Sequence, residues 1–455
     1  MHIHILGICG TFMGGIAALA KTQEHKVTGC DQNVYPPMST QLKTLGIEIT
    51  EGYSLSEHIH TPDIYIIGNV ISRGNELMEM ILNRNLLFTS GPQWLYENIL
   101  IDKWVLAVAG THGKTTTSAM LSWILESCGL APGFLIGGIP NNFGVSARLA
   151  KDNNKNVPSF FIIEADEYDS AFFDKRSKFI HYHPRTLILN NLEFDHADIF
   201  DDITHIEKHF HHLIRTIPSE GKVLVNSESR PLSNLIKQGS WSEIEYFGYD
   251  SQWEYEKIED DSSSFKVLLN KKNQGTINWA LIGHHNLMNA LAAISAARHV
   301  GITPIDSIES LNKFNGVKRR MELIHTSNQI ELYDDFAHHP SAIKTTLEGL
   351  KKSSKDGRII AVIEPRSNTM KLGTMKEDLL NSLKNADFVF CYSKNLSWNP
   401  EVLFEKHHNI KVLEDLTELS EAIISEAKPS DKILFMSNGN FSVLHKKVID
   451  LLKGS

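Results

Sequence analysis

A glycine turn followed by Lys-Thr is the strongest chemical signal in the sequence. The segment GTHGKTTT, residues 110–117, directly follows an apolar run at 104–109, and apolar residues with helical spacing come after it. A strand, a glycine turn, Lys-Thr and a helix together are typical of a phosphate-binding loop. The one departure is Val108, which stands where that pattern usually begins with glycine. The segment predicts a site for the phosphates of a nucleotide.

The residue types in this loop indicate how it would bind phosphate. Gly110 and Gly113 let backbone N–H groups approach phosphate oxygens, and the helix N-terminus adds the positive end of its dipole. Lys114 supplies a positive charge to the terminal phosphates, and the Thr115 hydroxyl is a ligand for Mg²⁺. The residues expected to contact the nucleotide here are Gly110, Thr111, His112, Gly113, Lys114, Thr115 and Thr116.

Two further segments place acidic side chains directly after apolar runs. Glu164 begins EADEYD, and Asp195 and His196 lie in NNLEFDHAD. Mg²⁺ prefers oxygen ligands, and an acid at the end of a strand beside a phosphate loop is well placed to supply one. We expect Glu164 to bind the metal, and Asp166 and Glu167 to be solvated or one step removed from it. Because histidine is a less usual ligand for Mg²⁺, His196 would mark a specialised site.

A second glycine turn lies near the start of the chain. GICGTFMGG, residues 7–15, follows an apolar run and resembles a dinucleotide-binding fingerprint with its last glycine displaced. Asp31 ends the next apolar run, where an acidic side chain would meet a ribose hydroxyl. Taken alone, this turn fits a nicotinamide-dependent dehydrogenase equally well.

The composition excludes several classes of protein. The 455 residues include 45 Lys and Arg and 54 Asp and Glu, a formal net charge of −9, which argues against binding nucleic acid over a broad basic surface. Hydrophobic residues make up 42% and charged residues 22%, as in soluble globular proteins. Four cysteines without a CxxC pair are typical of a reducing compartment, and no uncharged apolar run is long enough for a membrane span. The composition favours a cytoplasmic protein that contacts neither nucleic acid nor membrane.

Short apolar runs alternate with helical stretches along the chain, which predicts an α/β fold with parallel sheets. At roughly 150 residues per domain, the length suggests about three domains. A new hydrophobic run at Trp104 and a renewed pattern near Gly316 indicate the boundaries, so we expect domains at 1–102, 103–317 and 318–455. Residues 241–279 are polar and alternating, and they predict an antiparallel flap.

Two polar segments follow apolar runs in the last part of the chain. YDDFAHHP places His338 just beyond two acids, and EPRSNTMKLG places Arg366 and Lys371 after a strand end. A loop at such a strand end faces the cleft of an α/β fold, and cations there suit the carboxylates of a substrate. We expect Arg366 and Lys371 to bind a carboxylate-bearing substrate.

Six segments occur in one order along the chain: GTHGKTTT, EADEYDSAF, NNLEFDHAD, GHHNLMNALAA, GVKRRME and YDDFAHHP. Their joint order is far more specific than any one of them, and with it the sequence resembles the Mur ligase family over most of its length. The resemblance implies three domains: a Rossmann-like N-terminal domain that binds a UDP-sugar, a central P-loop ATPase-type α/β domain, and a C-terminal Rossmann-like α/β domain that binds a peptide.

The family resemblance implies an ATP-dependent ligase that forms an amide bond through an acyl phosphate. HILGICGTFMGG, DQNVYPPMSTQL, EPRSNTMKLG and MSNGNF favour the branch that joins the lactyl carboxylate of UDP-N-acetylmuramate to the amine of the murein tripeptide L-Ala-γ-D-Glu-meso-diaminopimelate, in peptidoglycan recycling. Two alternatives stay open. One is a ligase that adds L-alanine to the same acceptor, and the other is a nucleotide-binding regulator without catalytic activity.

The resemblance also implies roles for individual residues. Lys114 and Thr115 would meet the phosphates of ATP and Mg²⁺, while Glu164 and His196 would hold the metal. The residues implied elsewhere around ATP are His285 and Asn289 at the adenine, Arg320 at a phosphate and Asp335 at the ribose.

For the other substrates, the resemblance implies contacts from the first and last domains. His338 is the candidate for helping to remove a proton from the attacking amine, and Arg366 with Lys371 would bind the peptide. The residues expected near the UDP-sugar are Gly7, Gly10, Thr11, Asp31, Asn69, Arg73 and Asn75.

Overall fold

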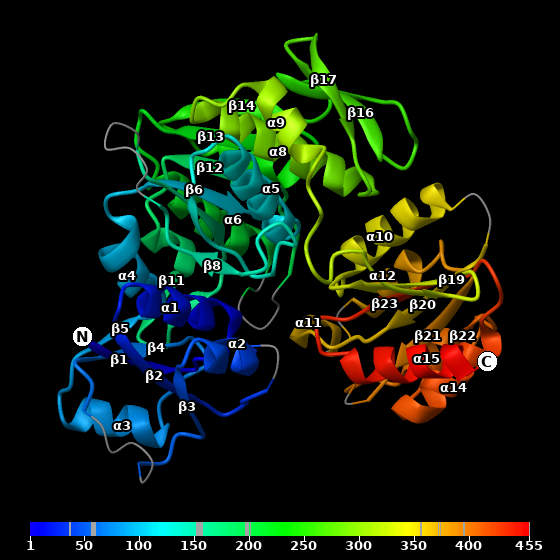
Figure 1. Ribbon diagram of the computed structural model, residues 1–455, viewed down its shortest axis with the longest axis horizontal. Coiled ribbons are helices and arrows are strands. Elements are labelled where there is room, and N and C mark those ends of the chain that lie inside the picture. Colours follow the sequence, from blue (N-terminus) through cyan, green and yellow to red (C-terminus); the bar gives the residue numbers. More distant parts are fainter. Residues whose placement is uncertain are drawn as a thin grey trace.

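The computed structural model describes residues 1–35, 38–55, 61–151, 158–195, 200, 202–354, 357–371, 373, 375–394 and 396–454. Three large sheets follow one another along the chain, each flanked by helices (Figure 1). Most strand pairs within them are parallel, so the expected α/β fold class is confirmed. Among the described residues, no helix is long and apolar enough to cross a membrane.

The first sheet has five parallel strands in the order β3-β2-β1-β4-β5. This is the strand order of the first part of a Rossmann fold, in which ligands bind at the carboxyl ends of the strands. Its strands are β1 (His2–Leu6), β2 (Lys26–Asp31), β3 (Glu48–Glu51), β4 (Ile64–Ile67) and β5 (Phe88–Ser90). Its helices are α1 (Thr11–Thr22), α2 (Met38–Thr44), α3 (Glu76–Asn83) and α4 (Gly91–Leu95), followed by a π-helical turn at Tyr96–Leu100.

The second sheet has ten strands in the order β17-β16-β15-β14-β13-β12-β6-β9-β7-β8. The run from β14 to β7 is parallel, while β8 and the β15–β17 ribbon add antiparallel edges. The strands are β6 (Trp104–Ala109), β7 (Gly133–Leu135), β8 (Ala147–Arg148), β9 (Phe160–Ala165), β12 (Thr186–Leu189), β13 (Lys222–Asn226), β14 (Glu243–Phe247), β15 (Trp253–Lys257), β16 (Ser264–Leu269) and β17 (Lys272–Asn278).

Helices cover both faces of this sheet. Its helices are α5 (Lys114–Ser127), α6 (Ile203–Ile214), α7 (Arg230–Lys237), α8 (His284–His299) and α9 (Pro304–Leu311). A two-stranded ribbon of β10 (Asp169–Ala171) and β11 (Asp174–Ser177), followed by a 3-10 turn at Lys178–His181, lies outside the sheet. The expected antiparallel flap is present as β15–β17, but it begins later than the sequence suggested. The half-buried strand β14 instead extends the parallel sheet beside β13.

The third sheet has six strands in the order β18-β19-β23-β20-β21-β22, all parallel except for β18. The strands are β18 (Glu322–Ser327), β19 (Ile330–Asp335), β20 (Ile359–Ile363), β21 (Phe388–Tyr392), β22 (Ile410–Leu413) and β23 (Lys432–Met436). The helices are α10 (Pro340–Ser353), α11 (Asn368–Lys371), α12 (Lys376–Ser382), α13 (Pro400–Phe404), α14 (Leu416–Glu426) and α15 (Ser442–Gly454).

Packing holds the first sheet against the second. One continuous apolar cluster includes Ile5 from β1, Leu135 from β7 and Val105 from β6. Gly15 on α1 packs so closely that an added Cβ would come within 2.1 Å of Leu135 Cδ1. Burial of apolar surface at this contact stabilises the packing of the first sheet against the second. The glycine turn before α1 is therefore held next to the loops of the central sheet.

Candidate active site

One large cleft of about 2250 Å³ is lined by loops from all three sheets. All the residues that the sequence singled out as candidate site residues lie in its wall, except Gly110, Glu167 and His196. Gly110 is a buried residue at the end of β6, and His196 lies outside the residues that the structure describes. The geometry therefore brings side chains from distant parts of the chain to one place, as carboxyl ends of parallel strands do.

The phosphate loop, residues 110–116, connects β6 to α5 as the sequence predicted. The Lys114 ammonium donates hydrogen bonds to the Gly110 carbonyl at 2.5 Å and to Glu167 Oε2 at 3.2 Å. Burial alone would lower the pKa of Lys114, but the carboxylates of Glu167, Asp166 and Glu164 outweigh it and raise this pKa. Lys114 is therefore a partly buried cation, with its side chain 15% exposed, which suits it to binding phosphate.

The ion pair between Glu167 and Lys114 is a contact that the sequence reasoning missed. The Glu167 side chain is only 3% exposed, and it forms an ion pair with Lys114. Glu167 is therefore not solvated, and the expectation that it lies one step removed from the metal stays a prediction. The alternating acids of EADEYD contain no signal that distinguishes this position from its neighbours.

We predict that Gly113→Ala disrupts the phosphate loop. Gly113 has φ +81°, and an added Cβ would lie 2.4 Å from Asn190 Nδ2 and 2.5 Å from Asn289 Oδ1. Gly129 provides a matched control, since its φ is +79° but nothing lies within 4 Å of an added Cβ. Gly129→Ala should cost about 1 kcal/mol of stability through backbone strain alone, and Gly113→Ala roughly 2–4 kcal/mol. Urea unfolding measures both, and equal losses would contradict the packing described here.

Glu164 and Thr115 form a pair of oxygen donors beside Lys114. Glu164 Oε1 accepts a hydrogen bond from the Gly137 amide at 2.6 Å. Burial raises the pKa of Glu164, although the Gly137 amide, the Lys114 charge and the Thr115 hydroxyl oppose this rise. A partly buried carboxylate next to a hydroxyl is a set of oxygen ligands that fits Mg²⁺, because a hard cation prefers oxygen and would stabilise the ionised acid.

The last sheet contributes a guanidinium to the phosphate loop. Arg320 Nη2 lies 3.2 Å from the Thr115 hydroxyl oxygen, and the guanidinium stacks 4.9 Å from the centre of the Phe336 ring. Asp335, at the end of β19, accepts hydrogen bonds from the Met321 and Ala337 amides, both at 2.7 Å. These contacts fix Asp335 and the chain around Arg320, so the last sheet places a positive charge next to the loop of the central one.

The two residues expected near the adenine, His285 and Asn289, both lie on α8. Burial lowers the pKa of His285 to about 4, so its imidazole is neutral. Asn289 Oδ1 accepts hydrogen bonds from Thr117 at 3.0 Å and from Asn190 at 2.8 Å. Asn289 therefore also braces the back of the phosphate loop, a contact that its sequence motif does not reveal.

In the first domain, several expected substrate residues have intramolecular partners. Asp31 accepts hydrogen bonds from the Cys9 and Asn33 amides, at 2.9 and 3.0 Å, and so holds the first glycine turn. Arg73 forms a two-point ion pair with Glu79, and Asn75 caps α3. Gly7, Gly10, Thr11 and Asn69 lie on the cleft wall beside them.

In the last sheet, Arg366 and Lys371 lie where β20 ends. Arg366 is exposed to the cleft and packs on the backbone of Gly439, which follows β23. Among the described residues, Arg366 has no ion-pair partner. The neighbouring strands β20 and β23 lead to helices on opposite faces of the sheet: β20 is followed by α12 on one face, and β23 is followed by α15 on the other. Arg366 therefore lies at a topological switch point, where α/β folds bind ligands.

His445 on α15 predicts a pH dependence of stability. Its side chain is 12% exposed, and burial lowers its pKa to about 4. The unfolded chain takes up a proton near pH 6.5 and the folded chain does not, so this contribution to stability is lost as the pH falls from about 6.5 to 4. We expect the His445→Gln variant to lose roughly 1–2 kcal/mol less than the wild type between pH 7 and pH 5 in urea unfolding. Identical losses would contradict the burial of a neutral imidazole.

Family models match the chain in three stretches. The model described as Mur ligase family, catalytic domain matches residues 2–100, Mur ligase middle domain matches 108–297, and Mur ligase, glutamate ligase domain matches 319–439. The chain belongs to the Mur ligase family, whose members are ATP-dependent ligases that form amide bonds.

Individual proteins and solved structures within this family are similar to the chain over nearly its whole length. The UDP-N-acetylmuramate–L-alanyl-gamma-D-glutamyl-meso-2,6-diaminoheptandioate ligase of Escherichia coli (strain K12) is 51% identical over 453 residues, which cover 99% of this chain and 98% of the relative. The crystal structure of a murein peptide ligase from Psychrobacter arcticus 273-4 has 44% identity and a TM-score of 0.78, covering 100% of this chain and 99% of that one. A UDP-N-acetylmuramate–L-alanine ligase of Clostridium tetani (strain Massachusetts / E88) is 29% identical, over 96% of this chain and 95% of the relative.

Proposed function

We propose that this protein joins the lactyl carboxylate of UDP-N-acetylmuramate to the amine of L-alanyl-γ-D-glutamyl-meso-diaminopimelate, converting ATP to ADP and phosphate, in peptidoglycan recycling. The observation that carries the proposal is the convergence of Lys114, Glu164 and Arg320 on one cleft. The first glycine turn and Arg366 line the same cleft. The identity of about half the residues with a relative that bears this activity in its name supports the choice of substrates.

The chemistry explains why cations converge. A carboxylate cannot form an amide directly, because its oxygen is a poor leaving group. Transfer of the γ-phosphoryl group to the carboxylate makes an acyl phosphate, and the amine then displaces phosphate. Two anions must first approach, and each pair of unit charges about 4 Å apart at an effective dielectric constant of about 20 repels by about 4 kcal/mol. Lys114 and Arg320 would offset this repulsion and hold the reactants in line.

We assign ATP and Mg²⁺ to the central part of the cleft. Lys114 and the backbone of the phosphate loop would bind the phosphates, and Thr115, Glu164 and His196 would hold Mg²⁺. Bound there, Mg²⁺ would neutralise charge on the phosphates. His285 and Asn289 would meet the adenine, while Asp335 would meet the ribose from the last domain. We retain domain boundaries at 1–102, 103–317 and 318–455 for this division of tasks.

The UDP-sugar and the peptide would occupy the two ends. Gly7, Gly10 and Thr11 at the start of α1 would bind the diphosphate, and Asp31, Asn69, Arg73 and Asn75 would line the nucleoside end. Arg366 and Lys371 would bind carboxylates of the tripeptide.

His338 would receive a hydrogen bond from the attacking amine. Its Nδ1 lies 2.9 Å from the Phe336 carbonyl oxygen. A carbonyl only accepts, so Nδ1 carries the hydrogen and Nε2 is the acceptor. Burial lowers the pKa of His338 to about 4, which keeps the ring neutral. His338 would therefore orient the neutral amine more than it would store its proton.

We place this activity in the cytoplasm, without nucleic-acid or membrane partners. All four cysteines are free thiols, which suits a reducing compartment.

Product mass after incubation tests the proposed function. The protein is mixed with ATP, Mg²⁺ and UDP-N-acetylmuramate, together with either the tripeptide or free L-alanine. We expect the mass of the UDP-N-acetylmuramyl tripeptide, formed in step with ADP, and no product with alanine. A product only with alanine would assign the chain to the L-alanine-adding activity. ADP release without any peptide bond would reject both.

A further inference from the structure

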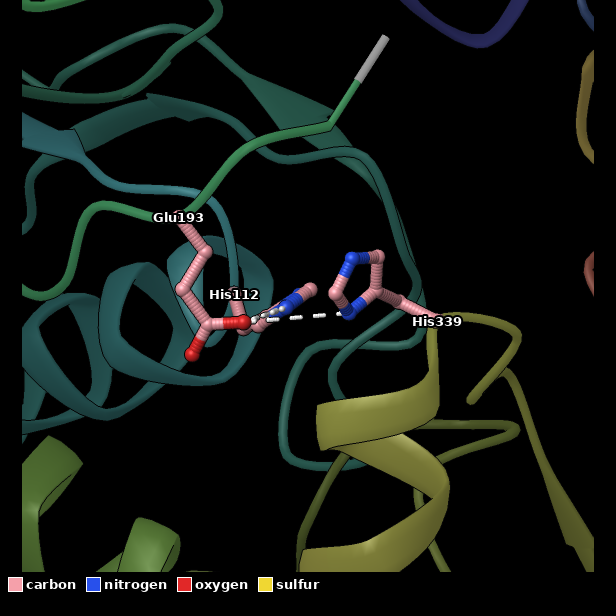
Figure 2. Close-up of side chains that lie close together, drawn as sticks. All are labelled: His112, Glu193 and His339. Atoms are coloured by element: carbon pink, nitrogen blue, oxygen red, sulfur yellow. Dashed lines mark ion pairs between the residues drawn. The ribbon is translucent and has the colours of Figure 1, made fainter. Parts of the chain in front are cut away.

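Three metal-ligating side chains meet where the last domain touches the phosphate loop. Figure 2 shows His112 from the loop, Glu193 from the chain after β12, and His339 immediately before α10. Glu193 Oε2 lies 3.4 Å from His112 Nε2 and 3.7 Å from His339 Nδ1. One ligand atom from each of the three residues lies within 4.8 Å of the other two.

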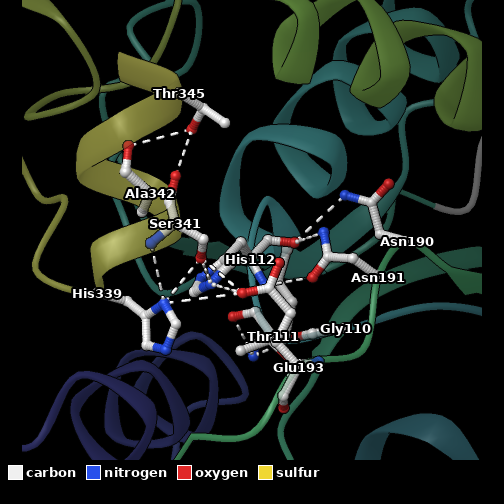
Figure 3. Close-up of polar contacts among 11 residues, drawn as sticks. Gly110, Thr111, His112, Asn190, Asn191, Glu193, His339, Ser341, Ala342 and Thr345 are labelled. Carbon is white, nitrogen blue, oxygen red and sulfur yellow. Dashed lines mark hydrogen bonds and ion pairs between the residues drawn. The ribbon is translucent and has the colours of Figure 1, made fainter. Parts of the chain in front are cut away.

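The Ser341 hydroxyl fills the point on which these atoms converge (Figure 3). Its oxygen lies 2.6 Å from Glu193 Oε2, 2.7 Å from His339 Nδ1 and 2.9 Å from His112 Nε2. The Ser341 amide donates to His339 Nδ1 at 3.3 Å, which makes this nitrogen an acceptor. Ser341 therefore supplies a donor to each of two acceptors, its hydroxyl to Glu193 Oε2 and its amide to His339 Nδ1.

Carboxylate and imidazole atoms that converge in this way are the groups that bind a divalent transition-metal ion. Zn²⁺ binds nitrogen and oxygen at about 2.0–2.2 Å in a tetrahedron, which separates its ligands by about 3.3–3.6 Å. The two distances from Glu193 Oε2 to the imidazole nitrogens lie close to that spacing. Two histidines and one carboxylate are also a known zinc ligand set, with a fourth position left for a water molecule.

The backbone is fixed around two of the three residues. The His112 amide donates to Asn191 Oδ1 at 2.7 Å, and the Glu193 amide donates to Thr111 Oγ1 at 2.9 Å. These bonds hold the two side chains in the positions from which they converge.

We propose that His112, Glu193 and His339 form a binding site for a divalent transition-metal ion such as Zn²⁺. The site uses none of the residues assigned to Mg²⁺, and its nitrogen ligands favour a softer ion than Mg²⁺. His112, Glu193 and Ser341 line the cleft, which gives an ion a path of entry.

An ion bound here would tie two domains together. His112 and Glu193 belong to the central sheet, whereas His339 precedes the first turn of α10 in the last one. The metal would hold α10 against the phosphate loop, so we expect it to slow any step that requires the domains to separate.

Co²⁺ titration of the metal-free full-length protein tests the proposal without measuring activity. Co²⁺ replaces Zn²⁺ and absorbs visible light strongly when it is tetrahedral. We expect one Co²⁺ per chain with such a band, displaced by one equivalent of Zn²⁺ and unaffected by Mg²⁺. His339→Ala should weaken binding by at least about tenfold. His408→Ala, a change at an exposed histidine of the same domain, should leave it unchanged.

Glu193→Gln is the second variant, since it keeps the size of the side chain and should weaken Co²⁺ binding by a similar factor. Circular dichroism checks that each variant is folded. Absence of a tetrahedral band in the wild type overturns the proposal. So does a band that His339→Ala and Glu193→Gln both leave intact. Because the readout is binding, failure of this site leaves the ligase activity untouched.

Discussion

Lys114→Ala should abolish ligation while the protein stays folded. Lys114 is the partly buried cation of the phosphate loop, and its ammonium would face the phosphates where negative charge gathers. Removing one such group from a preorganised site typically costs a factor of 10²–10³, and a full charge costs more, so we expect kcat/KM to fall by more than about 10³-fold. Phosphate release and product mass, measured with all three substrates, check this result.

The controls for this prediction follow from the ion pair with Glu167. Lys114→Ala removes the positive charge beside the buried Glu167 carboxylate, which costs stability. Lys114→Ala combined with Glu167→Gln also removes the negative charge and should recover the thermal midpoint without recovering activity. Lys175→Ala removes an exposed lysine on β11 and should change neither the thermal midpoint nor the activity. Near-normal turnover by a folded Lys114→Ala protein would contradict the phosphate-loop assignment.

Arg366→Ala should raise the KM for the tripeptide and leave the KM for ATP nearly unchanged. The Arg366 guanidinium faces the cleft at the switch point of the last sheet and has no ion-pair partner among the described residues. A charge-assisted hydrogen bond to a carboxylate contributes about 1.5–3 kcal/mol, which corresponds to a rise of about 10–150-fold in KM. Initial rates with each substrate varied in turn separate the two constants.

Lys376→Ala is the matched control for Arg366→Ala. Lys376 is an exposed cation at the start of α12 in the same domain, and it lies outside the cleft wall. We expect no change in either KM. A rise of the same size in the KM for ATP and for the tripeptide in Arg366→Ala would place this arginine outside the peptide site.

The central strands could be predicted from the sequence because both of their faces are buried. Strands such as β6 and β20 are continuous apolar runs, which is the pattern that parallel strands between helices require. The edge strands β3 and β22 are half-buried or exposed, so their residues carry no such pattern and were not expected. The strand β14 alternates like a flap strand, yet pairing with β13 sets its direction.

Some residues of the candidate site could likewise be predicted from the sequence, and others could not. Lys114, Glu164 and Arg320 belong to motifs whose residue types already indicate phosphate and metal chemistry, and the fold brings them into one cleft. Glu167 and Ser341 could not be identified, because their importance comes from contacts across 53 and 148 residues of sequence. Such contacts depend on how loops and domains pack, and no local spacing encodes them.

Transfer of ¹⁸O tests the central claim, that the lactyl carboxylate is phosphorylated before the amide forms. UDP-N-acetylmuramate labelled with ¹⁸O in both carboxylate oxygens is converted with ATP and the tripeptide, and the released phosphate is analysed by mass. The mechanism predicts one ¹⁸O atom in each phosphate molecule, because the carboxylate oxygen leaves with the phosphoryl group. Phosphate without ¹⁸O, formed together with the amide product, would contradict it.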